Sequence, residues 1–137
     1  MSWNHVSSAI GDACVQAEVL NEGRRRALVV RLLERLAVDV TGRFPWERGG
    51  EGKQRTDGWE LIPEFVGSNV CLMFFDGADE IRKFQSGQDL LRVLKNCPPL
   101  EFYVCDEDAS YLLCHNHHDF VVGWGRASQW VERLGNA

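Results

Sequence analysis

The sequence lacks the long apolar run of a membrane-spanning helix and the N-terminal pattern of a secretory leader. Its longest strongly apolar run covers residues 70–75, whereas a membrane-spanning helix needs about 20 apolar residues. Residues 1–5 contain neither the basic stretch nor the apolar stretch of a signal peptide. We therefore expect a cytoplasmic protein that does not bind membranes.

The cysteines lack the paired C-x-x-C spacing of many zinc sites and redox sites. The chain has five of them, an odd number, at widely scattered positions: Cys14, Cys71, Cys97, Cys105 and Cys114. With no export signal, this pattern predicts reduced and mostly buried thiols, and it implies no disulfide framework.

Positive charge is scarce, above all in the second part of the chain. The formal net charge is -5, and residues 59–137 hold twelve Asp and Glu against six Lys and Arg. Nonspecific binding to nucleic acid depends on basic side chains that neutralise phosphates, so we expect no nucleic-acid partner. A cationic protein partner fits this charge better, although a modest negative charge is also an ordinary route to solubility.

The length and the hydrophobic content are those of one globular domain. The chain has 137 residues, of which 45% are hydrophobic, enough to bury a core without disulfides or metals. We predict a single domain over residues 1–137 with a flexible polar loop at residues 47–58. This loop is rich in glycine, but Gly52-Lys53 is followed by Gln54, which does not match a phosphate-binding loop. The sequence does not indicate an oligomeric state.

The spacing of apolar residues predicts an α+β fold. Apolar residues at intervals of three and four predict helices over residues 3–21, 24–37, 87–96 and 126–134. Short apolar or alternating runs predict an antiparallel sheet with strands over residues 69–75, 101–105, 110–115 and 119–123. The order of these elements favours two N-terminal helices, a sheet that contains a β-meander, and helices packed mainly on one face.

Three segments leave alternatives open. The two N-terminal helices form either a hairpin or one kinked helix, because Gly23 lies between them. Residues 59–65 form a turn or a short helix broken by Pro63, and residues 80–84 are a possible further strand. Ser86 has the type and position of a helix N-cap, with Asp89 in the place that Glu takes in a capping box.

The turn that joins the last two predicted strands is the sharpest chemical cluster. It reads CHNHHD, from Cys114 to Asp119, and a metal-assisted hydrolase would use His115, His117, His118 and Asp119 as ligands. On a strand, however, only alternate residues share a face, and Cys114 points away from His115. A zinc site needs three or four converging ligands, so we expect no metal and no other cofactor.

A structural interpretation explains more of the same turn. Asn and Asp tolerate turn dihedral angles and bond to their own backbone, and a histidine packed beside Trp124 or Trp130 can donate to a carbonyl. The turn also shows no nucleophile with a base partner, so we predict no catalytic residues.

The acidic turn at residues 106–108 and one tryptophan are candidates for protein binding. Asp106, Glu107 and Asp108 occupy a predicted hairpin tip, where they would attract a cationic partner. Trp124 stands between two glycines beside the histidine turn, which favours an exposed recognition aromatic. Trp3, Trp59 and Trp130 are most simply core residues. The predicted binding surface therefore combines the acidic turn, the histidine turn and Trp124.

The C-terminal part of the sequence resembles a family of small bacterial proteins that is described only as a domain of unknown function. The resemblance rests on residues 113–120 (LCHNHHDF), on Gly125-Arg126-Ala127 and on Trp130-Val131. It covers residues 59–134, and it implies a bacterial origin and a small α+β domain without an established activity. In size and charge the chain is also similar to immunity proteins that neutralise bacterial toxins.

Two functions follow from these residues. The first is a non-catalytic protein-binding module, such as an immunity-type inhibitor of a toxin, and the absence of a converging catalytic set favours it. The alternative is a small metal-assisted hydrolase built on the 114–119 cluster of His, Cys and Asp. An enzyme is therefore the less favoured class.

Overall fold

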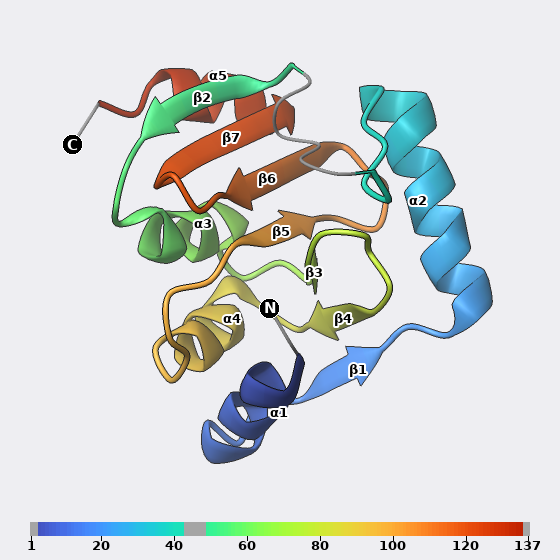
Figure 1. Ribbon diagram of the computed structural model, residues 1–137, viewed down its shortest axis with the longest axis vertical. Coiled ribbons are helices and arrows are strands. Elements are labelled where there is room, and N and C mark those ends of the chain that lie inside the picture. Colours follow the sequence, from blue (N-terminus) through green and yellow to red (C-terminus); the bar gives the residue numbers. More distant parts are fainter. Residues whose placement is uncertain (1–2, 43–48, 136–137) are drawn as a thin grey trace.

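The computed structural model describes residues 3–42 and 49–135, which form five helices and seven strands (Figure 1). The helices are α1 (Trp3–Asp12), α2 (Glu22–Leu36), α3 (Gly58–Val66), α4 (Gly87–Leu94) and α5 (Ala127–Glu132). The strands are β1 (Ala17–Val19), β2 (Glu51–Gln54), β3 (Cys71–Phe74), β4 (Ile81–Phe84), β5 (Phe102–Cys105), β6 (Tyr111–His115) and β7 (Phe120–Gly125).

All seven strands belong to one sheet, in the order β1-β4-β3-β5-β6-β7-β2. Each neighbouring pair is antiparallel. The predicted meander is confirmed, since β5 pairs with β6 and β6 with β7, with Cys114 opposite both Tyr103 and Val122. The possible strand at residues 80–84 is confirmed as β4. The fold is therefore α+β with an antiparallel sheet.

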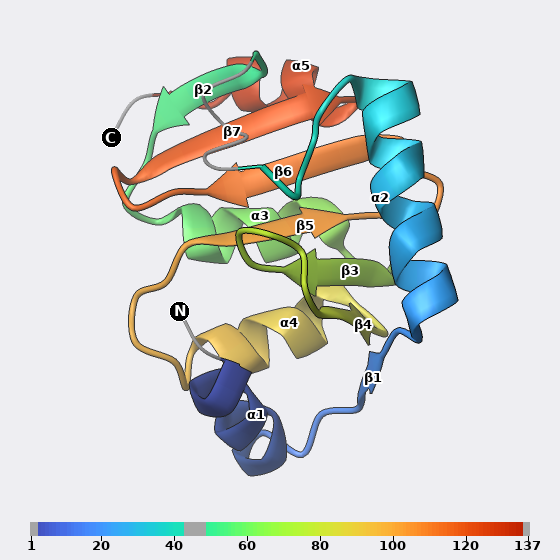
Figure 2. The same ribbon diagram turned by 45° about the vertical axis from the view of Figure 1, so that its right-hand side comes forward.

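Both faces of the sheet are covered, and each has its own hydrophobic core. Along β5, Val104 belongs to the core that α1, α3, α4 and α5 share, while Tyr103 belongs to the core that α2 completes. In both ribbon views α2 runs beside the sheet, apart from the other four helices (Figures 1 and 2). Burial on both faces explains why β3 and β5 consist almost entirely of apolar residues.

The first predicted helix is too long, and both predicted arrangements of the N-terminal helices are wrong. Helix α1 ends at Asp12, and Cys14 follows with a left-handed φ of 55°. Residues 17–19, predicted as helix, form β1 and pair with β4. The helical spacing continues to Leu20, but the free edge of β4 supplies backbone partners, among them the carbonyl of Ile81 for Leu20 N–H at 2.9 Å. Tertiary pairing therefore outweighs the local pattern.

The predicted polar loop at residues 47–58 contains a strand that its sequence does not indicate. Residues 51–54 form β2, which pairs with β7 from Glu51 opposite Gly123 to Gln54 opposite Phe120. Residues 47 and 48 lie outside the described residues. An edge strand keeps one side open to water, so its side chains need not be apolar. The polar sequence of residues 51–54 does not indicate a strand, because the stability of β2 comes from its pairing with β7.

Helices α3 and α4 pack closely against one another beside the sheet. Pro63 lies inside α3 without ending it, so the predicted break at this residue is wrong. Ser86 caps α4 as predicted, because its side chain accepts a hydrogen bond from Asp89 N–H at 3.2 Å. Gly87 lies directly on α3, and a Cβ atom there would stand 2.1 Å from the carbonyl oxygen of Pro63. The missing side chain permits this approach.

The thiols are free in the structure, and three of the five are buried. Cys71, Cys105 and Cys114 lie in the core, Cys97 is half-buried and Cys14 is exposed. The prediction of mostly buried thiols is thus confirmed. Among the described residues, no helix has both the length and the apolar character to cross a membrane.

Candidate functional site

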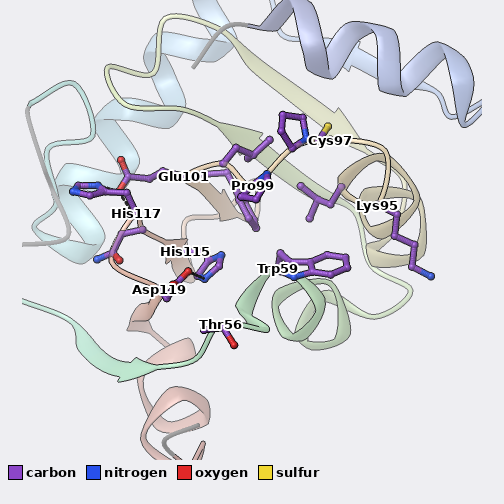
Figure 3. Close-up of a pocket in the computed structure, with 14 residues that line it drawn as sticks. Thr56, Trp59, Lys95, Cys97, Pro99, Glu101, His115, His117 and Asp119 are labelled. Atoms are coloured by element: carbon purple, nitrogen blue, oxygen red, sulfur yellow. Dashed lines mark hydrogen bonds and ion pairs between the residues drawn. The ribbon is translucent and has the colours of Figure 1, made fainter.

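A cavity of about 620 Å³ opens beside the turn between β6 and β7 (Figure 3). Its wall comes from the start of α3, from the end of α4 with the chain that leads to β5, and from the β6–β7 turn. Most of the lining surface is apolar, and the lining includes Thr56, Trp59, Cys97, Glu101, His115 and Asp119. This size falls within the range of small-molecule pockets.

The pocket depends on the close approach of α3 to β6. Gly58, the first residue of α3, packs on His115, and a Cβ atom at Gly58 would lie 2.8 Å from His115 Cδ2. The same atom would lie 2.5 Å from Val121 Cγ2 in β7. A larger residue would push α3 outward, so this glycine sets the position of Trp59 opposite the histidine.

His115 is the buried polar group of the pocket. Only 6% of its surface is exposed, and neither Nδ1 nor Nε2 makes a hydrogen bond of good geometry with the described residues. The backbone of Arg55 is the nearby hydrogen-bonding group that favours the protonated ring. Its ring meets Phe102 edge-on, with the ring centroids 6.2 Å apart. Burial lowers the pKa of His115 below its ordinary value of 6.5, although the nearby Asp119 carboxylate acts in the opposite direction. The imidazole is therefore neutral near pH 7.

Asp119 brings the nearest carboxylate to this imidazole. Its Oδ1 atom lies 3.8 Å from His115 Nε2, and its side chain is 54% exposed at the mouth of the pocket. The residue has a left-handed φ of 62°, which Asp tolerates better than most side chains. In Figure 3 Asp119 stands beside His115, and Trp59 faces them across the cavity. The site thus has a polar end and an aromatic wall.

Asn116 holds the turn itself, as the structural interpretation predicts. Its buried side chain accepts hydrogen bonds from His118 N–H at 2.9 Å and from Phe120 N–H at 3.0 Å. The backbone of Asp119 also donates to the carbonyl of Asn116 at 3.1 Å. One part of that interpretation is wrong, because the ring of His115 packs on Phe102 instead of a tryptophan.

His117 and His118 lie apart from the imidazole of His115. His117 Nδ1 is 3.1 Å from Glu101 Oε1. The side chains of His117 and Glu101 point away from Trp59 (Figure 3). Burial, followed by the neighbouring Asp76 carboxylate, raises the pKa of Glu101. His118 instead lines a second, shallower cavity of about 290 Å³ beside β2. Of the turn residues from Cys114 to Asp119, the structure therefore brings His115, Asn116, His117 and Asp119 to one pocket.

The metal-assisted alternative finds no support in the geometry. Across residues 3–42 and 49–135, no three His, Cys, Asp or Glu side chains converge closely enough to hold a metal ion. Cys114 belongs to the core on the α2 face, opposite to His115, as the strand period predicts. Cys97 lines the pocket, but burial raises the pKa of its thiol. No activated nucleophile results from these positions.

The acidic turn lies at the other end of β6 from the histidine turn. Five residues of β6 separate the two turns, a length of about 17 Å at the rise of a strand. The predicted combined surface of Asp106–Asp108 with Asp119 is therefore wrong. Asp106 has a structural role within its turn, because its carboxylate accepts hydrogen bonds from the backbone N–H at 2.7 Å and from the hydroxyl of Ser110.

Basic side chains of the same protein already contact the acidic turn. Glu107 lies 3.0 Å from Lys83 Nζ and 3.6 Å from a guanidinium nitrogen of Arg24. The carbonyl of Asp108 accepts a hydrogen bond from Arg35, near the end of α2. These contacts tie α2 to the turn, and they reduce the field that it presents to a partner.

Trp124 is buried, so its prediction as an exposed recognition aromatic is wrong. It is 5% exposed and belongs to the core on the α2 face. Trp3, Trp59 and Trp130 are partly buried against the other core, which confirms their assignment only in part. Trp59 lines the cavity beside the β6–β7 turn.

Sequence reasoning missed the opposite wall of the pocket. Part of this wall comes from Thr56, just before α3, and from Trp59 in its first turn. The rest comes from the chain that follows α4, with Cys97, Pro99 and Leu100. Nothing in the spacing of these residues links them to the histidine turn, because sheet order and helix packing bring the three segments together. The one local sequence feature at this wall is Trp59 directly after Gly58, the glycine that begins α3.

No protein-family model, no curated protein and no solved structure matches this chain. The function proposed below therefore rests on the residues of the site and their geometry.

Proposed function

We propose that this protein is a non-catalytic binding protein and that the pocket between α3 and the β6–β7 turn is its binding site. One observation carries the proposal: a largely apolar cavity of about 620 Å³ contains a buried imidazole that makes no hydrogen bond of good geometry with the described residues. Buried polar atoms are normally paired, so an unpaired one in a cavity indicates a place for a ligand atom.

Binding is favoured over catalysis by what surrounds His115. A general base requires a nucleophile or an acidic proton within hydrogen-bond reach, and no described side chain bonds to either nitrogen of His115. The hydrolase alternative also needs a cluster of metal ligands, which the described residues do not form. A ligand that fills the cavity needs only the apolar wall and one polar contact.

The predicted cationic protein partner, including an immunity-type role, stays a prediction. It rests on the acidic balance of residues 59–137, and the contacts of Glu107 with Arg24 and Lys83 add nothing to it. The relationship to the bacterial family that the C-terminal residues resemble also stays a prediction.

A neutral apolar dye tests the proposal directly. N-phenyl-1-naphthylamine fluoresces strongly in an apolar site, and we expect saturable binding to the purified protein with one site per chain. Trp59→Ala removes part of the wall and should weaken binding about tenfold, the effect of losing roughly 1.4 kcal/mol. The matched control is Leu33→Ala, since Leu33 is an exposed apolar residue of α2 on the other face.

Thermal unfolding of each variant shows whether it is folded. Absence of saturable binding, or equal weakening by Leu33→Ala, would contradict the proposed site.

Cys97 provides a second measurement at the same wall. In a Cys14→Ser background the exposed thiol is gone, and Cys97 is the most accessible thiol that remains among the described cysteines. Bound dye should slow its reaction with a thiol reagent, because the ligand covers this side of the pocket. An unchanged reaction rate at saturating dye would place the dye elsewhere on the protein.

A further inference from the structure

The two ends of the pocket differ in chemistry. Trp59 and Phe102 supply aromatic surface, while His115 and Asp119 supply the polar groups at the β6–β7 turn. Thr56 lies near the same end in Figure 3. A molecule that fits both ends needs an apolar body and one polar head.

The charges around His115 are mainly negative. Asp119 faces it from the turn at 3.8 Å, and Asp57 faces it from the segment before α3. Asp57 is already paired with Arg55 at 2.9 Å, and Glu101 lies 3.1 Å from His117, so Asp119 is the lining carboxylate placed for a ligand at His115. From β5 the apolar Phe102 meets the ring edge-on. A cationic head is attracted to this end, whereas an anionic head is repelled.

The hydrogen-bonding capacity of His115 points the same way. Burial keeps the imidazole neutral near pH 7, and a neutral imidazole has one nitrogen that accepts a hydrogen bond. The gap of 3.8 Å between His115 Nε2 and Asp119 Oδ1 is too long for a good hydrogen bond between them. A protonated amine has several N–H donors, and it satisfies the imidazole nitrogen and the carboxylate together.

Basic groups of the pocket do not offset this preference. Lys95 is the one Lys or Arg among the described lining residues. In Figure 3 it lies on the far side of Trp59 from His115 and Asp119. A carboxylate at the polar end would therefore meet Asp119 without a cation to balance it.

We propose that the pocket binds an amine with a ring-containing apolar body, whose ring packs on Trp59 and whose ammonium group lies between His115 and Asp119. This inference rests on the proposed binding function, since it names the ligand class of the same site. Ring contact with Trp59 adds apolar burial and an aromatic pair, and the acidic residue selects the charge.

Three probes that share one body test the inference: 2-naphthylmethylamine, 2-naphthylmethanol and 2-naphthoate. Titration calorimetry near pH 7.5 should rank the amine first, the alcohol second and the carboxylate last. We expect the amine to bind at least about tenfold more tightly than the carboxylate, because one close charge pair near a protein surface supplies that factor or more.

Asp119→Asn is the decisive variant. It keeps the size of the side chain, and Asn tolerates the left-handed backbone that this position requires. The ratio of amine to alcohol affinity should fall toward one, because the charge that selects the ammonium group is gone. The matched control is Asp108→Asn, an exposed acidic residue at the opposite end of β6, which should leave all three affinities unchanged.

Each outcome separates the two proposals. If none of the three probes binds, the proposed binding function is wrong and the ligand class falls with it. If the probes bind without preference, or the carboxylate binds best, the binding function stands and the amine class is wrong. A preference for the amine that survives Asp119→Asn also overturns the inference, because the charge would then come from elsewhere.

Discussion

The Nε2 atom of His115 and the Oδ1 atom of Asp119 lie 3.8 Å apart, across the mouth of the pocket. Asn116 fixes the turn between them, and Asp119 has a left-handed backbone. The imidazole is thus buried beside a carboxylate that lies too far away to accept a good hydrogen bond from it. Leaving such a group unpaired costs folding free energy. The cost has a simple explanation if the pocket exists to bind something.

The first prediction concerns the pH dependence of stability through His115. The pKa of His115 is about 6.5 in the unfolded chain, and burial lowers it in the folded protein. At a pH between the folded and the unfolded pKa, the unfolded chain therefore binds more protons. Stability is therefore fully present above pH 6.5 and falls as the pH decreases toward the folded pKa. One proton limits this slope to about 1.4 kcal/mol per pH unit. Urea unfolding between pH 7.5 and pH 5 measures it.

The variant His115→Gln removes this titration and should flatten the pH slope. His5→Gln serves as the control, because His5 is an exposed residue of α1. A wild-type slope that His115→Gln leaves unchanged would contradict the assignment to His115.

The second prediction concerns the acidic turn. Asp106→Ala removes the acceptor of the backbone N–H and the hydroxyl of Ser110, and it should lower the free energy of unfolding by about 1 to 3 kcal/mol. The carboxylate of Asp108 is exposed, so Asp108→Ala should change stability by less than about 0.5 kcal/mol. Chemical denaturation compares the two variants. Equal effects would show that the acidic turn has no internal cap at Asp106.

The third prediction concerns Trp124, whose substitution should lower the stability of the fold instead of weakening the binding of a partner. Trp124 lies in the core on the α2 face, so Trp124→Ala should destabilise the fold by about 3 to 5 kcal/mol. Trp124→Phe should cost less, since an aromatic ring remains and Trp124 Nε1 has no partner to lose among the described residues. Thermal and urea unfolding test both. A Trp124→Ala protein with wild-type stability would be incompatible with this packing.

The fourth prediction tests the contact between α3 and α4. Gly87→Ala places a Cβ atom against the carbonyl oxygen of Pro63 at 2.1 Å and must push the helices apart. We expect a loss of about 1 to 3 kcal/mol, as for other overpacked sites. Gly23→Ala in α2 meets only Asn21 Oδ1, at 3.6 Å, and should stabilise by about 0.5 to 1 kcal/mol. Opposite signs in a melting experiment are the expected result.

The fifth prediction concerns metal content. Elemental analysis of the purified protein should find no stoichiometric zinc, because the described residues bring no three potential ligands together. One equivalent of metal that disappears in His115→Ala or His117→Ala would restore the hydrolase alternative.

The residue pattern predicts those parts of the fold that depend on local period and burial. The meander of β5, β6 and β7 follows from three short apolar runs separated by polar turns. The cap of α4 follows from Ser86, and the turn geometry at Asn116 follows from the bonds that Asn makes with its own backbone. Neighbouring residues control all of these features, so a short stretch of sequence contains the necessary information.

Edge strands β1 and β2 could not be predicted, because their stability comes from a partner elsewhere in the chain. Residues 17–19 carry a helical spacing and residues 51–54 carry none, yet β4 and β7 supply backbone hydrogen bonds to them. The burial of Trp124 is also decided by distant packing, since two flanking glycines suggest exposure while the α2-face core surrounds the ring.

The sequence by itself determined that His115 and Asp119 share a turn, and that Cys114 faces away from that histidine. Only the tertiary structure decided that this turn meets Trp59 and the chain after α4 around a cavity. The physical reason is that a pocket needs walls from segments far apart in sequence, and their approach depends on contacts such as Gly58 against His115. Local patterns carry no information about which surfaces will face one another across empty space.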